Sequence, residues 1–338
     1  MEKFSYSKLN TFESCPYKFK LQYRDKHFPD STTLANEFGT LVHFIEETIA
    51  KDIIANNDEP IFMLDDNKYI EMFLHKDSID SDNNKVLCVD SLKQKYDSKH
   101  FSDKDKQGFS YNDKVKAYLD SGINRLRNYL AKNRDLRIVG VEKEFNLEHK
   151  DYIFHGFIDR AFKNIKTGEI YVEDIKTWDT IKGHDLKTPL QLTLYSIAAS
   201  QIFETDKVSC GYDLPLIDER HTAGTIGYIE RGIKKIDKLL ESIEAENFEP
   251  KPTPLCHWCV FSPTYIEGQP EDAKGLCPYF SHWTKAKADF SVEFEWAGME
   301  NNDKVLEAYT KSLEAKEHPI IIEKKVVLDN SRRLLIRR

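Results

Sequence analysis

Apolar positions along the chain follow two periods, and the changes from one period to the other mark the expected elements. Helical spacing predicts helices over residues 4–23, 36–54, 113–132, 189–203 and 232–247. Strand-like runs occupy residues 137–176, which read as a three-stranded meander, together with 207–215 and 222–230. The order helix, sheet, helix, sheet, helix predicts an α/β protein in which helices flank a central sheet.

Two segments stand apart from this pattern. Residues 56–112 are polar and rich in charge, with stretches such as D-S-I-D-S-D-N-N-K that bury little surface, so we expect an insertion with short helices. The tail over residues 281–338 predicts a helix near 303–315 and a β pair through I-I-I-E-K-K-V-V-L and R-R-L-L-I-R-R. The expected organisation is a main domain over residues 1–280, interrupted at 56–112, and an α/β extension over 281–338.

The strand-rich block carries the candidate chemistry. Its last two strands contain G-F-I-D-R and E-D-I-K-T, joined by a polar turn. Because strand side chains alternate faces, Asp174 and Lys176 point the same way, and a hairpin brings Asp159 across from them. Carboxylates bind a hard cation such as Mg²⁺ that keeps several waters, and a lysine can orient or deprotonate the attacking water and offset charge on a phosphate. The pattern favours a metal-dependent nuclease, although acid-x-Lys also arises by chance on exposed strands.

Two helices carry polar residues that suit the same site. G-T-L-V-H places His43 on a helix, where a lone histidine is more often structural, and a ligand role requires that it face Asp159. Q-L-T-L-Y places Gln191 and Tyr195 one helical turn apart. That pair is either the polar edge of an amphipathic helix or a lining of the site near substrate phosphate or Lys176.

Six cysteines at irregular spacing favour metal ligation or buried thiols over a disulfide framework. Cys256 and Cys259 form C-H-W-C, Cys277 follows, and Cys15 lies far upstream before a proline. Four such thiolates can hold one zinc ion or an iron–sulfur cluster, and His257 offers a mixed zinc set.

Composition narrows the setting. The chain of 338 residues is 40% hydrophobic, which suffices for a folded core. No apolar run is long enough to span a bilayer and the start lacks an apolar signal core, so we expect a cytoplasmic protein with no membrane partner. The net charge of −8 gives no general attraction to nucleic acid, so DNA contact requires local patches. Candidates are the interleaved aromatic and basic residues of 4–24 and the arginines of 332–338.

The order of these motifs resembles the RecB-type nucleases of the PD-(D/E)xK superfamily, including AddB-like and CRISPR-adaptation exonucleases that carry an iron–sulfur cluster. The similarity covers most of the chain up to about Phe280. Its motifs are S-Y-S-K-L-N-T-F-E-S-C-P-Y-K-F, G-T-L-V-H, G-F-I-D-R, E-D-I-K-T and Q-L-T-L-Y. The sequence departs from the family in the long gap between Cys259 and Cys277, in the polar insertion and in the tail.

The resemblance implies a restriction-endonuclease-like mixed sheet flanked by helices, with a cysteine-ligated cluster joining the N- and C-terminal parts. It implies that Mg²⁺ or Mn²⁺ is bound by His43, Asp159, Asp174 and the carbonyl of Ile175, that Lys176 is the catalytic lysine supported by Gln191 and Tyr195, and that a [4Fe–4S] cluster, or alternatively zinc, is held by Cys15, Cys256, Cys259 and Cys277.

The expected function is that of a DNA exonuclease in recombination, repair or replication, in a bacterial or phage-infected cell. Its DNA would be single strands or duplex ends, and its protein partner a recombination, helicase or single-strand-binding protein. No G-x-x-x-x-G-K-[ST] is present, so we expect a stand-alone nuclease rather than a fused motor. The alternatives are a catalytically inactive subunit that binds nucleic acid or forms a complex, and a zinc-stabilised interaction protein.

Overall fold

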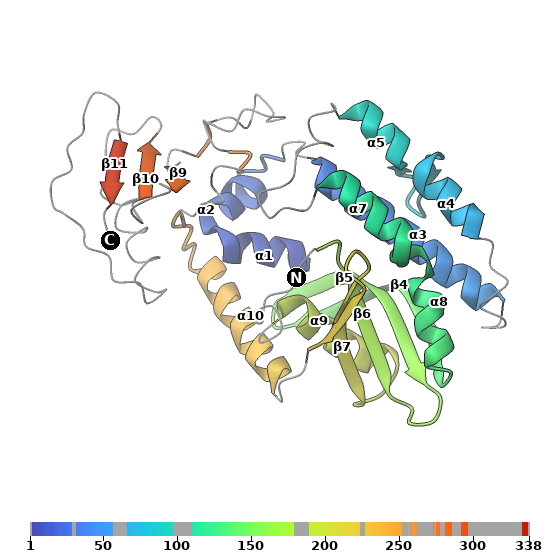
Figure 1. Cartoon of the computed structure of the whole chain (residues 1–338). Coiled ribbons are helices and arrows are strands. Elements are labelled where there is room, and N and C mark those ends of the chain that lie inside the picture. Colours follow the sequence, from blue (N-terminus) through green and yellow to red (C-terminus); the bar gives the residue numbers. More distant parts are fainter. Residues whose placement is uncertain are drawn as a thin grey trace. The chain divides into compact units, whose positions relative to one another are not determined.

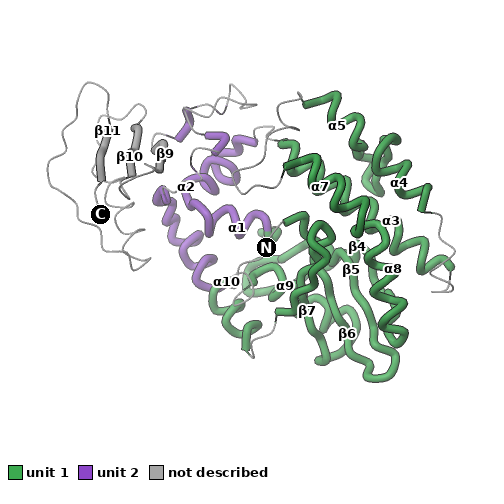
Figure 2. Tube along the Cα trace, in the orientation of Figure 1, with its two compact units in different colours: residues 1–6, 32–236 green, residues 7–31, 237–338 purple. Residues whose placement is uncertain are grey.

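The computed structural model of the chain describes most of the first 277 residues and three later strands. The described residues are 2–28, 32–56, 66–96, 110–178, 189–223, 227–251, 256, 259–261, 273, 275–277, 281–285, 292–296 and 333–336, the last three segments as backbone only. The helix expected at 303–315 and the strand expected at 320–328 lie outside them. The chain divides into two compact units, residues 1–6 with 32–236 and residues 7–31 with 237–338 (Figure 2). No helix among the described residues has the length and apolar character needed to cross a bilayer.

The larger unit is built on a mixed sheet (Figure 1). Within the described residues its strands are β1 (Glu2–Phe4), β4 (Leu136–His149), β5 (Tyr152–Asn164), β6 (Ile170–Ile175), β7 (Val208–Leu214) and β8 (Glu219–Thr222). β4, β5 and β6 form the expected antiparallel meander, and β7 runs parallel to β6 after the helix α9 (Leu190–Ile202). A mixed sheet flanked by helices fits the expected restriction-endonuclease-like fold.

One edge of β5 has two partners with a gap between them. β1 pairs in parallel with residues up to Phe154, and β6 pairs in antiparallel fashion from Arg160 onward. Along this edge the described strands leave residues 155–159 without a sheet partner. Asp159 is the last of these residues, so it lies beside the end of β6 rather than within the continuous sheet.

Helices pack on both faces of the sheet, and the polar residues beneath them differ between the two faces. α9 packs on β4, β6 and β7, on the face to which Asp159 and Asp174 belong, since Tyr195 of α9 reaches Asp159. α3 (Leu34–Ala55) and α8 (Ile123–Lys132) reach the opposite face, where Glu46 of α3 pairs with Arg160 and Arg125 of α8 pairs with Asp213. α3 begins at Thr33, whose side chain accepts a hydrogen bond from the Asn36 N–H. The core on this side also includes residues of α4 (Asp66–Leu74), α5 (Val89–Lys95) and α7 (Tyr111–Ala117).

A buried group of charges lies under α3 and α8. Arg160 pairs with Glu173 at 2.6 Å, with Glu46 of α3 at 3.0 Å and with Asp213 of β7. Arg160 and Glu173 are also register partners on β5 and β6. Their pairing therefore supports the register of the two strands. In this register Asp159, just before Arg160, and Asp174, just after Glu173, lie opposite each other on the other face of the sheet.

Two expected elements were wrong. The helix expected over residues 4–23 is instead β1, α1 (Tyr6–Ser14), α2 (Pro16–Phe19) and a π-helical turn (Lys20–Arg24). Cys15 is extended before Pro16, which has no N–H to continue the first helix. The strand expected at 222–230 ends at Thr222, and Tyr228 begins α10 (Tyr228–Glu244) after Gly227 at φ +79°. The short apolar run there belongs to the helical pattern of α10.

The expected polar insertion contains α4, a small hairpin of β2 (Ser78–Ile79) and β3 (Lys85–Val86), and α5. The smaller unit contains α1, α2 and a ring cluster in which Phe19 packs against Phe12 and Phe248. Its described strands β9 (Ser281–Lys285), β10 (Val292–Trp296) and β11 (Arg333–Ile336) form an antiparallel sheet in the order β11, β10, β9.

Candidate active site

Asp159 lies at the end of the β5–β6 hairpin that is away from the turn. Its Oδ2 accepts the backbone N–H of Ile175 at 2.8 Å, and its Oδ1 accepts the hydroxyl of Tyr195 at 3.2 Å. The side chain is 9% exposed, so these hydrogen bonds fix its direction within a largely dry environment. The sequence predicts that the hairpin brings Asp159 next to the end of the following strand. The hydrogen bond between Asp159 and Ile175 shows that the two are in direct contact.

Asp174 and Lys176 lie on the same side of the strand end, as strand alternation predicts. Lys176 Nζ donates to Asp174 Oδ1 at 3.0 Å and lies 2.8 Å from Oδ2. Asp174 is fully buried, and its Oδ2 accepts no hydrogen bond from the described residues. Burial, aided by the charge of Asp159 and opposed by Lys176, raises the pKa of Asp174 to about 7.

The ammonium of Lys176 is held in its charged form. Burial alone would lower its pKa, but the carboxylates of Asp174 and Asp159 outweigh that effect, so the pKa of Lys176 is raised. A cationic side chain is thus fixed next to two carboxyl groups. Such a group can stabilise negative charge on a bound phosphate, because it is already oriented and shielded from water.

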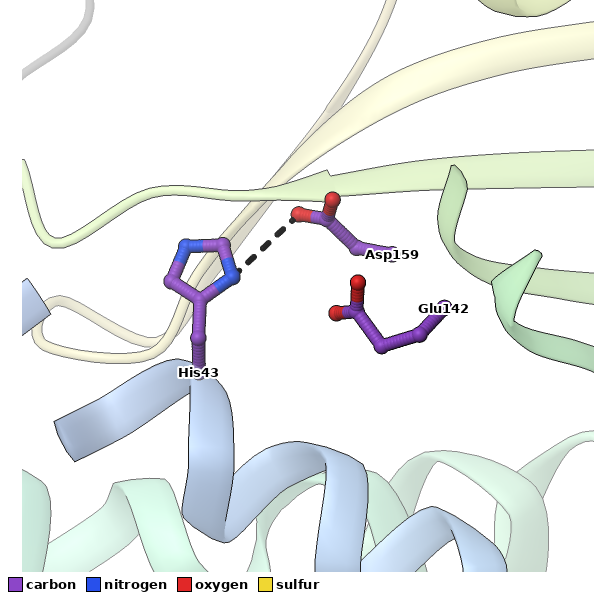
Figure 3. Close-up of side chains that lie close together, drawn as sticks. All are labelled: His43, Glu142 and Asp159. Carbon is purple, nitrogen blue, oxygen red and sulfur yellow. Dashed lines mark ion pairs between the residues drawn. The ribbon is translucent and has the colours of Figure 1, made fainter. Parts of the chain in front are cut away.

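His43 faces Asp159, which is the condition that its ligand role requires. Its Nδ1 lies 3.5 Å from Asp159 Oδ2 (Figure 3). Desolvation lowers the pKa of His43, although Asp159 and a backbone hydrogen bond with Ile175 act in the other direction. The imidazole is therefore neutral near pH 7, the form that binds metal ions.

Glu142 of β4 is a site residue that the sequence reasoning missed. Its position is opposite Asp159, because the register partners on either side are Val141 with Arg160 and Lys143 with Ile158. The sequence feature that could have identified it is the two-residue turn after His149, because the length of that turn fixes which residues of β4 and β5 lie opposite each other. Burial and the charge of Asp159 raise the pKa of Glu142 to about 8.

Three ligand atoms converge at this point. One atom each from His43, Glu142 and Asp159 lies within 4.8 Å of the other two, and Figure 3 shows the three side chains directed toward a common space. Asp174 is outside this triplet, with Lys176 as its neighbour. An imidazole nitrogen with carboxylate oxygens is a donor set that suits a divalent cation such as Mg²⁺ or Mn²⁺.

Gln191 and Tyr195 act on the site through Asp159. Gln191 Nε2 donates to the Tyr195 hydroxyl at 3.2 Å, and that hydroxyl donates to Asp159 Oδ1. The chain of hydrogen bonds runs along one turn of α9 into the sheet. These two residues therefore orient a carboxylate, and they do not form part of the ligand triplet.

The four candidate cysteines all belong to the smaller unit and are partly exposed. The Cys259 N–H donates to the Cys256 carbonyl at 3.1 Å, and Cys15 is close enough to raise the pKa of Cys259, after the larger effect of burial. Cys277 packs with Cys259 around a buried cluster of Leu21, Phe261 and Ala273. His257 lies outside the described residues.

The aromatic and basic residues of 4–24 pack within their own units. Phe4 and Phe19 are fully buried, Lys8 lies over the ring of Tyr23 at 5.5 Å, and Arg24 lies over that of Phe19 at 5.7 Å. Of the terminal arginines, the described backbone includes Arg333 alone, in β11.

Comparison with known proteins agrees with this geometry. Residues 3–264 match the family model of the PD-(D/E)XK nuclease superfamily. Among curated protein sequences, none matches the chain at a significant level. The family match covers most of the chain, including α3, α9 and the residues that gather around Asp159, so the chain belongs to the PD-(D/E)XK nuclease superfamily.

Proposed function

We propose that the protein is a metal-dependent deoxyribonuclease, specifically an exonuclease that hydrolyses phosphodiester bonds in DNA recombination, repair or replication. The observation that carries this proposal is the convergence of His43, Glu142 and Asp159 within 4.8 Å beside the ion pair of Asp174 and Lys176. Membership of a nuclease superfamily supports hydrolysis of a phosphodiester as the chemistry.

The residues that would hold Mg²⁺ or Mn²⁺ are His43, Asp159, Asp174 and the carbonyl of Ile175, with Glu142 as an additional ligand. When bound, a divalent cation supplies an activated water and offsets charge on the phosphate. In this role Asp174 would offer the cation its Oδ2, the oxygen that lies 2.8 Å from Lys176 Nζ. The raised pKa of Asp174, about 7, means that a cation would displace a proton from this group near neutral pH.

Lys176 is assigned the place next to the attacking water. Its ammonium is buried and its pKa is raised, so it stays protonated and serves by position and charge rather than as a base. Tyr195 and Gln191 keep the Asp159 carboxylate directed toward the site. Each of these groups is in place before substrate arrives, which lowers the reorganisation that the reaction requires.

We assign Cys15, Cys256, Cys259 and Cys277 to a [4Fe–4S] cluster that joins the two ends of the family region. The assignment is supported by the packing of Cys277 with Cys259 in this unit and by the effect of Cys15 on the pKa of Cys259. Zinc at the same four cysteines is the alternative.

The decisive experiment uses end-labelled single- and double-stranded DNA with Mg²⁺, Mn²⁺ or EDTA. Asp174→Ala and Lys176→Ala should abolish the metal-dependent degradation and leave the circular dichroism spectrum unchanged. Asp135→Ala and Lys166→Ala are the matched controls, because they remove an exposed Lys–Asp ion pair of 3.0 Å from the same unit. Digestion at the wild-type rate by either site variant would sink the proposal.

The cofactor assignment has its own readout. Protein purified without oxygen should be brown, with the visible absorption of thiolate-bound iron and about four irons per chain. Colourless protein with stoichiometric zinc would favour the alternative. The recruiting partner, proposed as a recombination, helicase or single-strand-binding protein, is sought by co-purification with the inactive Lys176→Ala variant.

A further inference from the structure

A cavity of about 540 Å³ adjoins the proposed metal site within the larger unit. His43 and Glu142, two of the three converging ligands, form part of its wall. Its volume lies within the range of about 300–1,000 Å³ that is usual for ligand pockets. The cavity is therefore continuous with the place where a scissile phosphate would bind.

The walls of the cavity come from several separate elements of the larger unit. One face of α3 contributes Asn36, Gly39, Thr40 and His43, which follow one another at helical spacing. The turn of the β2–β3 hairpin, part of the polar insertion, supplies the opposing acidic residues. Thr177 also lines the cavity, close to Gly39, since a Cβ built on Gly39 would lie 3.6 Å from Thr177 Oγ1.

Phe157 gives the cavity an aromatic surface. It lies on β5 two positions before Asp159, on the same face of the strand, within the stretch that β1 and β6 leave unpaired. Its side chain is 41% exposed, and its ring centroid lies 5.8 Å from that of His155. An exposed ring beside a phosphate site is the surface on which a nucleic-acid base stacks.

The charge of the cavity excludes phosphate and suits the edge of a base. Of the described residues that line it, none is lysine or arginine, whereas Glu47, Asp80 and Asp82 are acidic. The hairpin turn is held rigid, since Asp80 Oδ1 accepts the N–H groups of Asp82 at 2.9 Å and Asn84 at 2.8 Å. Carboxylates on this turn can accept hydrogen bonds from base amino groups, such as N4 of cytosine.

We infer that this cavity takes the unpaired base of a nucleotide next to the phosphate at the active site, with the base stacked on Phe157 and its amino edge toward Asp82. The inference rests on the proposed nuclease function and goes beyond it, because it selects single-stranded DNA and sets a base preference. Thymine presents a carbonyl oxygen where cytosine presents an amino group, so the acidic wall favours cytosine over thymine at this position.

Binding is measured by fluorescence anisotropy in Mg²⁺, in a Lys176→Ala background, with labelled oligo(dT) that carries one cytosine or one abasic nucleotide at successive positions. Phe157→Leu should weaken binding roughly 10-fold, since stacking on one ring contributes that order of affinity. Phe157→Trp should bind as tightly as the parent or more tightly. Ile165→Ala, which also truncates an exposed apolar residue of the same unit, should change nothing.

Two further arms identify the base itself. At a single position, the abasic nucleotide should weaken binding by the same factor as Phe157→Leu, and the two changes together should cost no more than either alone. Cytosine at that position should bind several-fold more tightly than thymine, and Asp82→Asn should remove the difference.

The outcomes separate the two proposals. If the parent binds single strands but Phe157→Leu binds equally well, or if no single position responds to base removal, the pocket assignment fails. Absence of any single-strand binding overturns it as well. If the unsubstituted enzyme binds DNA with the expected position dependence and yet never cleaves it, the nuclease function fails and the base pocket stands.

Discussion

The carboxyl of Asp174 is fully buried close to Asp159, an arrangement that disfavours the fold without a cation. Its folded pKa, about 7, is above the value near 4 of an unfolded chain. The protonated form therefore stabilises the fold below pH 4, and this contribution is lost as the pH rises through 7. The proposed metal site therefore has a cost in stability when Asp174 is ionised.

Asp174→Asn should accordingly stabilise the metal-free protein while abolishing activity. In EDTA at pH 8 we expect the free energy of unfolding to rise by roughly 1–3 kcal/mol, because the buried charge is gone. At pH 5, where Asp174 is largely protonated in the folded state, the gain should be smaller. Urea unfolding at both pH values measures this, and a variant less stable than the wild type at pH 8 contradicts it.

Tyr195→Phe removes the hydroxyl that orients Asp159 and keeps the ring. We expect a loss of about 10–100-fold in activity at limiting Mg²⁺, partly recovered when Mg²⁺ is raised, since partners of metal ligands have effects of this size. Mg²⁺ titration of the cleavage rate is the measurement. Tyr228→Phe is the control, because that hydroxyl contacts Ser196 and not the site. An unchanged Mg²⁺ requirement would show that the hydrogen bond to Asp159 has no positioning role.

At the scale of elements, α3 serves both faces of the sheet. It contributes His43 to the candidate site and Glu46 to the buried charges around Arg160. The same ion pairs that hold the helix to the sheet therefore also set the distance between His43 and Asp159. Stability and site geometry are linked through Arg160, which is 1% exposed and has three carboxylate partners.

Arg160→Met should destabilise the protein by about 3–5 kcal/mol, because it leaves Glu46, Glu173 and Asp213 buried with less compensation. Chemical denaturation followed by circular dichroism reports the change. Arg134→Met, at an exposed position on the turn before β4, should have no measurable effect. If Arg160→Met is as stable as the control, the buried charges do not fix the register of β5 and β6.

The β2–β3 hairpin, which walls the proposed base cavity, should be sensitive to acid. Burial would raise the pKa of Asp77, but the ammonium of Lys85 and the N–H of Cys88 outweigh it and hold the pKa well below its usual value. The stabilising contribution is thus present above pH 4 and is lost as the pH falls below that value.

Asp77→Asn tests this directly. The wild type should be more stable than the variant by a constant amount above pH 5, and the difference should shrink as the pH falls below about 4. Thermal unfolding over pH 3–7 gives the comparison, with Asp82→Asn on the same hairpin as the control. A difference that does not depend on pH would mean that the ionised carboxylate is not what holds the hairpin.

For the molecule as a whole, local patterns predicted what local geometry determines. Strand alternation placed Asp174 and Lys176 together, and helical spacing placed Gln191 next to Tyr195. Glu142 depended on a turn register between strands, and the burial of Arg160 depended on helices that pack from elsewhere in the chain. Neither of these is encoded in a local period, which is why sequence reasoning located the candidate residues of the β5–β6 hairpin and α9 but missed Glu142 and the charges around Arg160.

The proposed cluster makes a prediction about how the smaller unit holds together. Cys15 is separated from Cys256 by most of the chain, yet both belong to this unit. Because ligation of a metal centre contributes directly to folding, loss of the cluster should release residues 237–277. Limited proteolysis of Cys256→Ser should cut this segment roughly 10-fold faster than in the wild type, while the larger unit survives as a resistant fragment.

The matched control is Cys88→Ser, which changes a buried cysteine of the larger unit and should leave the 237–277 segment protected. Equal protection of that segment in Cys256→Ser and in the iron-loaded wild type would mean that packing around Phe261 alone holds the unit closed, and that the cysteines have no structural role.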